Sequence, residues 1–181
     1  MKKTILALAF ATSALTSHAA NYVSFDVDHV KDTSTNAKST AQYFRAGKDV
    51  ANMNLGLQVR TATFKEGGML NSVEATAGKD IIKNVNAFLG VGYDNGFNGA
   101  KNGDYTYGLA GLSTGTNIGP LWGYVGGKTR INWESDAPQQ TILFVGASYP
   151  VNKTLSFNVG VSRSYQDIKE RATGLGLRVS Y

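Results

Sequence analysis

The residues best suited to chemistry in this sequence are His29 and the two acids just before it, Asp26 and Asp28. A His–Asp pair would suit a hydrolase or an acyltransferase, in which the imidazole acts as a general base. Residues 22–30 alternate between apolar and polar types, however, so His29 falls on the strand face opposite to both aspartates. No serine stands at a marked position relative to His29. We therefore expect no catalytic residues and no enzymatic activity.

Metal and cofactor chemistry finds little support in the composition. The 181 residues include no cysteine and only two histidines, which excludes disulfides, thiolate sites and a His-rich zinc site. The glycines do not form a phosphate-binding loop, because no helical pattern follows any of them. The formal net charge of +5 is modest and dispersed, which argues against nucleic acid. The sequence predicts no metal, no cofactor and no nucleic-acid partner.

A second group of charged residues recurs on the polar face of alternating segments. Its members are the acids Asp26, Asp28, Glu74, Asp94 and Glu134 and the bases Arg45, Arg60, Lys128, Arg130 and Arg178. Facing one another inside a narrow barrel, such charges neutralise each other, because an unpaired buried charge is costly. We predict a salt-bridged, mostly closed interior. The alternative is a thin water-filled pore whose charged lining selects ions.

The elements that position these charges are ten predicted strands. They span 22–30, 41–47, 52–64, 70–78, 84–94, 104–115, 121–134, 140–149, 154–164 and 172–181. Pro120, Pro138 and Pro150 all fall between them, as expected of paired strands. No later segment shows an 18-residue apolar run or a sustained helical stripe. The pattern predicts an all-β, closed, antiparallel up-and-down barrel of ten strands, or of eight if the first two segments do not pair.

An internal echo indicates where the short turns lie. Ala46 to Val50 reads A-G-K-D-V, and Ala77 to Ile81 reads A-G-K-D-I. We expect both segments to be equivalent turns on the same side of the barrel. Together with the other breaks between segments, they predict short turns near 48–51, 79–83, 116–120 and 150–153.

Strand length and aromatic positions favour a membrane barrel over a soluble one. Strands of about ten residues at a tilt of roughly 45° cross a bilayer, whereas strands of soluble proteins cluster near five or six residues. Aromatic residues on the apolar parity mark two expected interfacial girdles: Tyr93, Tyr105 and Trp133 at one set of strand ends, and Tyr149 and Tyr181 at the other. Trp122 points inward unless a bulge at Gly126–Gly127 changes its parity.

The last residues, 174–181, carry the most specific resemblance. They read G-L-G-L-R-V-S-Y, with Leu175, Leu177, Val179 and Tyr181 on one face. With the strand pattern of the mature chain, this segment resembles the small bacterial outer-membrane β-barrel proteins, the class of the OmpA membrane domain and OmpX. Members usually end in Phe and the best-known have eight strands. The resemblance implies a monomer embedded in outer-membrane lipids and lipopolysaccharide, recognised through its last strand by the barrel assembly machinery.

The N-terminal segment 1–19 has the features of a signal peptide. Lys2 and Lys3 precede an apolar run over 5–15, and small residues lead to a cleavage site after Ala19. We expect Sec-dependent export of a mature chain, 20–181, that forms the barrel in the outer membrane of a Gram-negative cell.

Taken together, the sequence predicts an integral outer-membrane barrel with a structural, adhesive or weakly permeating, porin-like role. Two alternatives remain open. One is a lipid-modifying outer-membrane enzyme, and the other is a soluble periplasmic barrel that binds a ligand.

Overall fold

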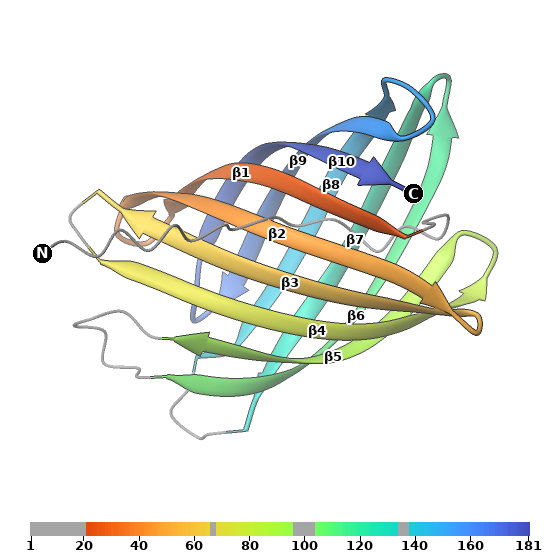
Figure 1. Cartoon of the computed structure of the whole chain (residues 1–181). Helices are drawn as coiled ribbons and strands as arrows, with labels where there is room; N and C mark the ends of the chain where they lie inside the picture. Colours follow the sequence, from red (N-terminus) through yellow and green to blue (C-terminus); the bar gives the residue numbers. More distant parts are fainter. Residues whose placement is uncertain (1–20, 66–67, 96–103, 134–137) are drawn as a thin grey trace, which may run out of the picture.

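The described residues of the computed structural model, 21–65, 68–95, 104–133 and 138–181, form ten strands in one closed antiparallel barrel (Figure 1). The strands are β1 (Tyr22–Asp32), β2 (Lys38–Val50), β3 (Met53–Phe64), β4 (Met69–Ile82), β5 (Val85–Asn95), β6 (Tyr105–Ile118), β7 (Leu121–Asn132), β8 (Gln140–Pro150), β9 (Leu155–Gln166) and β10 (Glu170–Ser180). Each pairs with the next in sequence, and β1 closes the barrel on β10. The predicted ten-stranded up-and-down barrel is confirmed, and the eight-stranded alternative is wrong.

Each strand has one apolar face turned outward and one largely polar face turned inward. Leu57, Leu89 and Leu175 are 44, 67 and 55% exposed on the outside, whereas Glu74 and Arg130 are each 3% exposed inside. Such an apolar outer face is unfavourable in water but favourable in a lipid bilayer. The closed barrel also leaves no strand edge with unpaired backbone groups in the bilayer. No helix long and apolar enough to cross a membrane occurs in the part of the chain described here.

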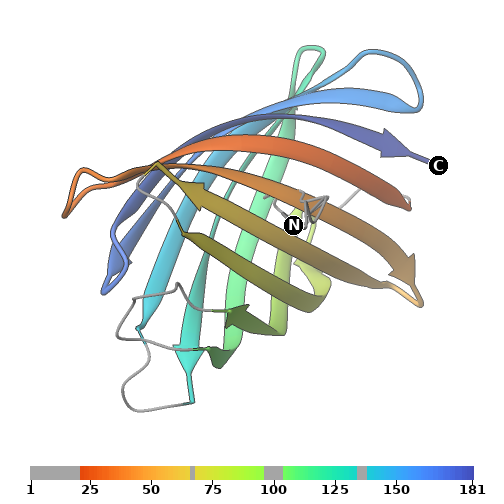
Figure 2. The ribbon, with the colours of Figure 1, turned by 60° about the vertical axis from the view of Figure 1, so that its left-hand side comes forward.

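The two ends of the barrel (Figure 2) differ in that the longest connections, between β5 and β6 and between β7 and β8, lie at one of them. Short turns join β2 to β3, β4 to β5, β6 to β7 and β8 to β9, and the C-terminus lies at this same end. In the first turn Ala51 and Asn52 have φ of 50° and 65°, the left-handed pair that a two-residue hairpin requires. The strands run further than predicted, because pairing continues to Val50 and Ile82. Lys48 and Lys79 therefore lie on strand ends, not in the turns.

The register between β6 and β7 is unbroken across Gly126 and Gly127, so no bulge changes the parity of Trp122. Its ring lies over Gly115 on β6, where an added Cβ would overlap it. Trp122 therefore faces inward. The register shift recorded in the sheet lies between β4 and β5, near Asp80.

Candidate functional site

The centre of the lumen is crossed by an ion-pair cluster of four residues: Glu74 on β4, Asp94 on β5, and Lys128 and Arg130 on β7. Arg130 Nη2 lies 2.7 Å from Glu74 Oε1, and its Nη1 lies 3.2 Å from Asp94 Oδ2. Lys128 Nζ contacts the other oxygen of Glu74. None of the four is more than 9% exposed. Each carboxylate therefore has a cationic partner, as burial of charge requires.

Two tyrosines of β6 complete the cluster. Tyr105 donates a hydrogen bond to Asp94 at 2.9 Å, and the Tyr107 hydroxyl lies 3.1 Å from both Glu74 and Asp94. The Arg130 guanidinium stacks 4.5 Å from the centre of the Tyr107 ring. This ring can lie flat because β5 has glycine at Gly92, where a Cβ would overlap it. Tyr107 thus links the two acids through its hydroxyl, and its ring contacts the base that pairs with both of them.

The cluster extends through Gln58 to the first strands. Gln58 Nε2 donates to Glu74 at 3.1 Å, and its Oε1 accepts a hydrogen bond from Arg45 Nε at 2.9 Å. Arg60 instead pairs with Glu170 on β10 at 3.3 Å. Polar contacts thus reach from β2 to β7 and, separately, from β3 to β10.

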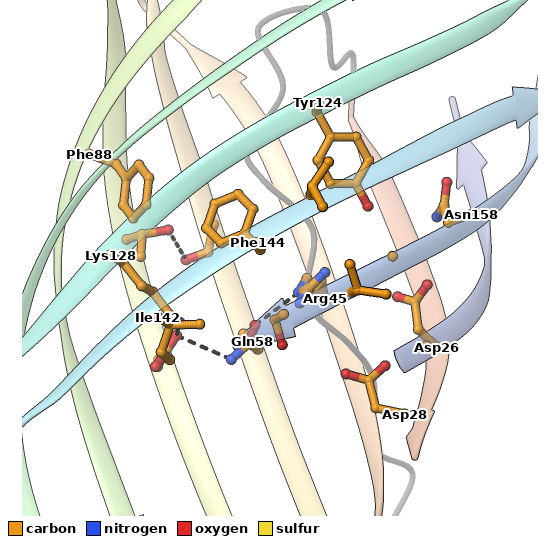
Figure 3. A pocket seen from close by; sticks show the side chains of 18 of the residues that line it. Asp26, Asp28, Arg45, Gln58, Phe88, Tyr124, Lys128, Ile142, Phe144 and Asn158 are labelled. Carbon is orange, nitrogen blue, oxygen red and sulfur yellow. Dashed lines mark hydrogen bonds and ion pairs between the residues drawn. The ribbon is translucent and has the colours of Figure 1, made fainter. Parts of the chain in front are cut away.

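Two cavities flank the cluster. The larger, of about 80 Å³, lies toward the short turns and is lined by Asp26, Asp28, Arg45, Tyr124 and Asn158 among others (Figure 3). We call it the turn-side cavity. The smaller loop-side cavity, of about 30 Å³, lies toward the longer connections. Four residues line both spaces, and we call them the partition: Gln58, Lys128, Ile142 and Ser162.

Charges in the turn-side cavity are not directly paired. Asp26 and Arg45 are 6 and 3% exposed. Neither Arg45 Nη atom nor Asp26 Oδ2 has a hydrogen-bond partner among the described residues. Asp26 and Asp28 lie over Gly176 and Gly174 of the neighbouring β10, where any Cβ would overlap them. These glycines let both carboxylates lie along the wall, and the cavity keeps polar atoms able to bind water or a small polar solute.

The structure places most of the predicted interior charges inside the barrel, but it pairs them selectively. Asp26, Asp28, Arg45, Arg60, Glu74, Asp94, Lys128 and Arg130 are buried there. Arg178 is inside too, but its guanidinium stacks 3.8 Å from the centre of the Tyr22 ring. Glu134 lies outside the described residues. The partner of Arg60, Glu170, was not among the predicted acids because the last strand was expected to begin at residue 172.

The position predicted for one member of the aromatic girdles, Tyr105, is wrong. Tyr105 is only 6% exposed and faces inward, since it shares the parity of Tyr107 and Leu109 on β6. The alternation near 105–114 is weak in the sequence, so it does not fix the strand face on which Tyr105 lies. Tyr93 and Trp133 are exposed at the loop end, and Tyr149 and Tyr181 at the turn end. Tyr165, 40% exposed at the loop end, was missed, although it has the parity of Phe157, Val159 and Val161.

The candidate His–Asp pair does not form in the structure. His29 is exposed on the outer face, opposite to Asp26 and Asp28, as its parity predicts. Among the described residues, no group of three or more His, Cys, Asp or Glu side chains could hold a metal ion. The interior offers charge pairing and hydration.

Comparison with solved structures finds barrels of the same kind. The beta domain of the Bordetella autotransporter BrkA is 11% identical over 90% of this chain and 99% of its own, with a TM-score of 0.53. Neisserial surface protein A is 16% identical over 89% and 97%, with a TM-score of 0.49. The KdgM porin is 9% identical over 87% and 99%, with a TM-score of 0.49. No family model and no curated protein matches the sequence.

At these identities the likeness concerns the fold alone. The chain has the fold of small bacterial outer-membrane β-barrels, which confirms the resemblance drawn from its strand pattern. Its outward apolar belt fits that environment.

Proposed function

We propose that this protein is an integral outer-membrane barrel whose lumen is closed to solutes, and that it serves a structural or surface-presenting role. The observation that carries the proposal is the ion-pair cluster of Glu74, Asp94, Lys128 and Arg130, which crosses the lumen and separates two small cavities. A ten-stranded barrel is only slightly wider than the eight-stranded kind, whose interior side chains fill. We expect the large side chains that cross its centre to leave no continuous path for solutes.

Export and orientation are part of the same proposal. Segment 1–19 acts as a signal peptide cleaved after Ala19 during Sec-dependent export, and the short turns face the periplasm. A cysteine at Lys79 should then resist a membrane-impermeant thiol reagent on intact cells, while one at Gln139, on the loop side, should react. Labelling of Lys79→Cys on intact cells would indicate the opposite orientation, with the short turns facing outward.

Partners follow from the outer surface of the barrel. Leu175, Leu177, Val179 and Tyr181 all point outward on the last strand and are 40 to 71% exposed. We propose that this row is read by the barrel assembly machinery, that the apolar belt contacts outer-membrane lipids and lipopolysaccharide, and that the barrel functions as a monomer.

A thin pore is the second candidate, and a specific observation supports it. Lys128 lines both cavities. Removing its side chain is therefore expected to open part of the partition. We expect the wild-type barrel to be silent in a planar lipid bilayer. Lys128→Ala is expected to give small, cation-favouring conductance steps, because Glu74 then faces the path with one base fewer.

Arg45→Ala is the matched control, since it removes a base of the larger cavity and keeps all four partition side chains. Gln58 loses its hydrogen bond from Arg45 but still donates to Glu74. Reproducible conductance of the wild type would favour the pore and contradict the closed lumen. Heat-modifiable migration on an SDS gel, measured on the same samples, establishes that each variant is folded.

A further inference from the structure

A row of basic side chains crosses the outer face of the barrel near its loop end. Lys31 on β1 stands directly opposite Arg171 on β10 and Lys38 on β2, and Arg171 stands opposite Arg163 on β9. All four side chains are exposed on the lipid-facing side of their strands. We call these four residues the basic row. Three strand spacings give it a length of about 14 Å.

The basic row is unfavourable as it stands. Cross-strand neighbours on one face have Cβ atoms about 5 Å apart, and like charges directly opposite each other destabilise a sheet. No ion pair to any of the four is found within the described ranges. Nearby acids are engaged elsewhere, since Asp32 accepts hydrogen bonds from Ser34 and Thr35, and Glu170 holds Arg60 inside. The row needs an external anion.

The first register row below the basic row holds His29, Thr173 and Val161, and the two rows below it are apolar. Val27, Leu175 and Val159 form one register row on the same three strands, and Phe25, Leu177 and Phe157 form the next. All six are 38 to 55% exposed. A ligand that matches this face has an anionic head at the loop end and hydrocarbon chains beneath it.

Depth and asymmetry point to the same ligand. The Arg163 guanidinium lies 5.2 Å from the centre of the Tyr165 ring, an exposed aromatic at the loop end where headgroups are expected. The outward faces of β5 to β8, over their described residues, carry no lysine or arginine. On the described strands, outward-facing positive charge at the loop end is thus confined to β9, β10, β1 and β2 instead of encircling the barrel, as a specific site requires.

We propose that the basic row, with the apolar strip beneath it, is a binding site for a phosphorylated lipid of the lipid A type in the outer leaflet. The proposal rests on the proposed membrane location and orientation. Phosphate groups neutralise the facing bases, and the acyl chains lie along β9, β10 and β1. Each basic residue near an anionic lipid surface contributes about 1 kcal/mol, which corresponds to about a fivefold change in affinity.

The test uses the folded barrel in neutral detergent, titrated with bisphosphorylated lipid A and followed by its thermal unfolding midpoint. Lys31→Gln with Arg171→Gln is the site variant. Lys48→Gln with Lys79→Gln, at the turn end, is the control with the same change of charge. Lipid A should stabilise the wild type and the control, with about 25-fold weaker apparent affinity for the site variant.

The test is specific because the difference in unfolding temperature between the wild type and the site variant should change sign when lipid A is added. Without lipid the site variant should unfold at the same or a higher temperature than the wild type, because it relieves repulsion. With saturating lipid A the wild type should be the more stable. Equal affinity of the two variants, or equal stabilisation of the wild type by dephosphorylated lipid A or by phosphatidylglycerol, would overturn the proposal. Loss of the heat-modifiable form in the wild type would instead contradict the membrane-barrel function.

Discussion

Across the middle of the lumen, every carboxylate of the ion-pair cluster contacts a base. Toward the short turns, Asp26, Asp28 and Arg45 line one cavity but form no ion pair with any described residue. The walls explain the difference. Asp26 and Asp28 lie along β10 over its glycines, while Glu74 and Arg130 project across the lumen from β4 and β7. An inward position alone therefore does not pair a charge. Pairing depends on whether the neighbouring strand lets the side chain lie flat against the wall.

The largest expected effect comes from breaking the paired region. Glu74→Gln leaves Lys128 without its carboxylate and Arg130 with only Asp94, so we expect a loss of about 3–5 kcal/mol in the free energy of unfolding. Urea unfolding in lipid vesicles, followed by tryptophan fluorescence, measures it. Asp28→Asn in the turn-side cavity is the control, with an expected change below about 1 kcal/mol. Equal losses in both variants would show that the two regions are energetically alike.

The packing beneath the two regions gives a second, smaller contrast. Gly92→Ala places a methyl group into the Tyr107 ring, and shifting that ring disturbs its contacts with Glu74 and Asp94. We expect a loss of about 1–3 kcal/mol, as for other overpacked sites, in the same urea assay.

Gly160→Ala is its partner in the turn-side cavity. A Cβ there would meet its nearest neighbour, the Val145 carbonyl oxygen, at 3.4 Å, an ordinary contact. A loss below about 1 kcal/mol is therefore expected. If Gly160→Ala proved the more harmful of the two, the cavity would be more tightly packed than its lining indicates.

The sequence predicts the strands and the side on which most residues lie, because both depend on local alternation. It does not predict which charges meet. Arg130 reaches Glu74 across two intervening strands, and Arg60 reaches Glu170, 110 positions away in the chain. Such pairs depend on strand tilt and register around the closed barrel, which no single segment encodes. The predicted outward position of Tyr105 is wrong for a local reason, because glycine and alanine at 108, 110 and 111 weaken the alternation of its strand.

The basic row follows the same rule. Lys31, Lys38, Arg163 and Arg171 are separate in sequence, and only the pairing of β9, β10, β1 and β2 brings them together. Parity alone would have placed each of them outward. Their adjacency is a property of the register.

The smallest expected effect is that of Arg45→Met, which is compared with Arg130→Met. Arg45→Met removes one hydrogen bond to Gln58, whose amide group still donates to Glu74, and it removes two Nη atoms that have no partner among the described residues. The lost hydrogen bond contributes about 0.5–1.5 kcal/mol, but the variant no longer has to bury the guanidinium charge, which offsets that loss. We therefore expect the free energy of unfolding to change by less than about 1 kcal/mol in either direction. Arg130→Met strips both Glu74 and Asp94 of their shared base and should cost several times more. Paired urea titrations of the two variants compare them directly. A loss for Arg45→Met as large as that for Arg130→Met would mean that Arg45 holds Asp26 and Asp28 through ordered water, and that the turn-side region is a paired cluster as well.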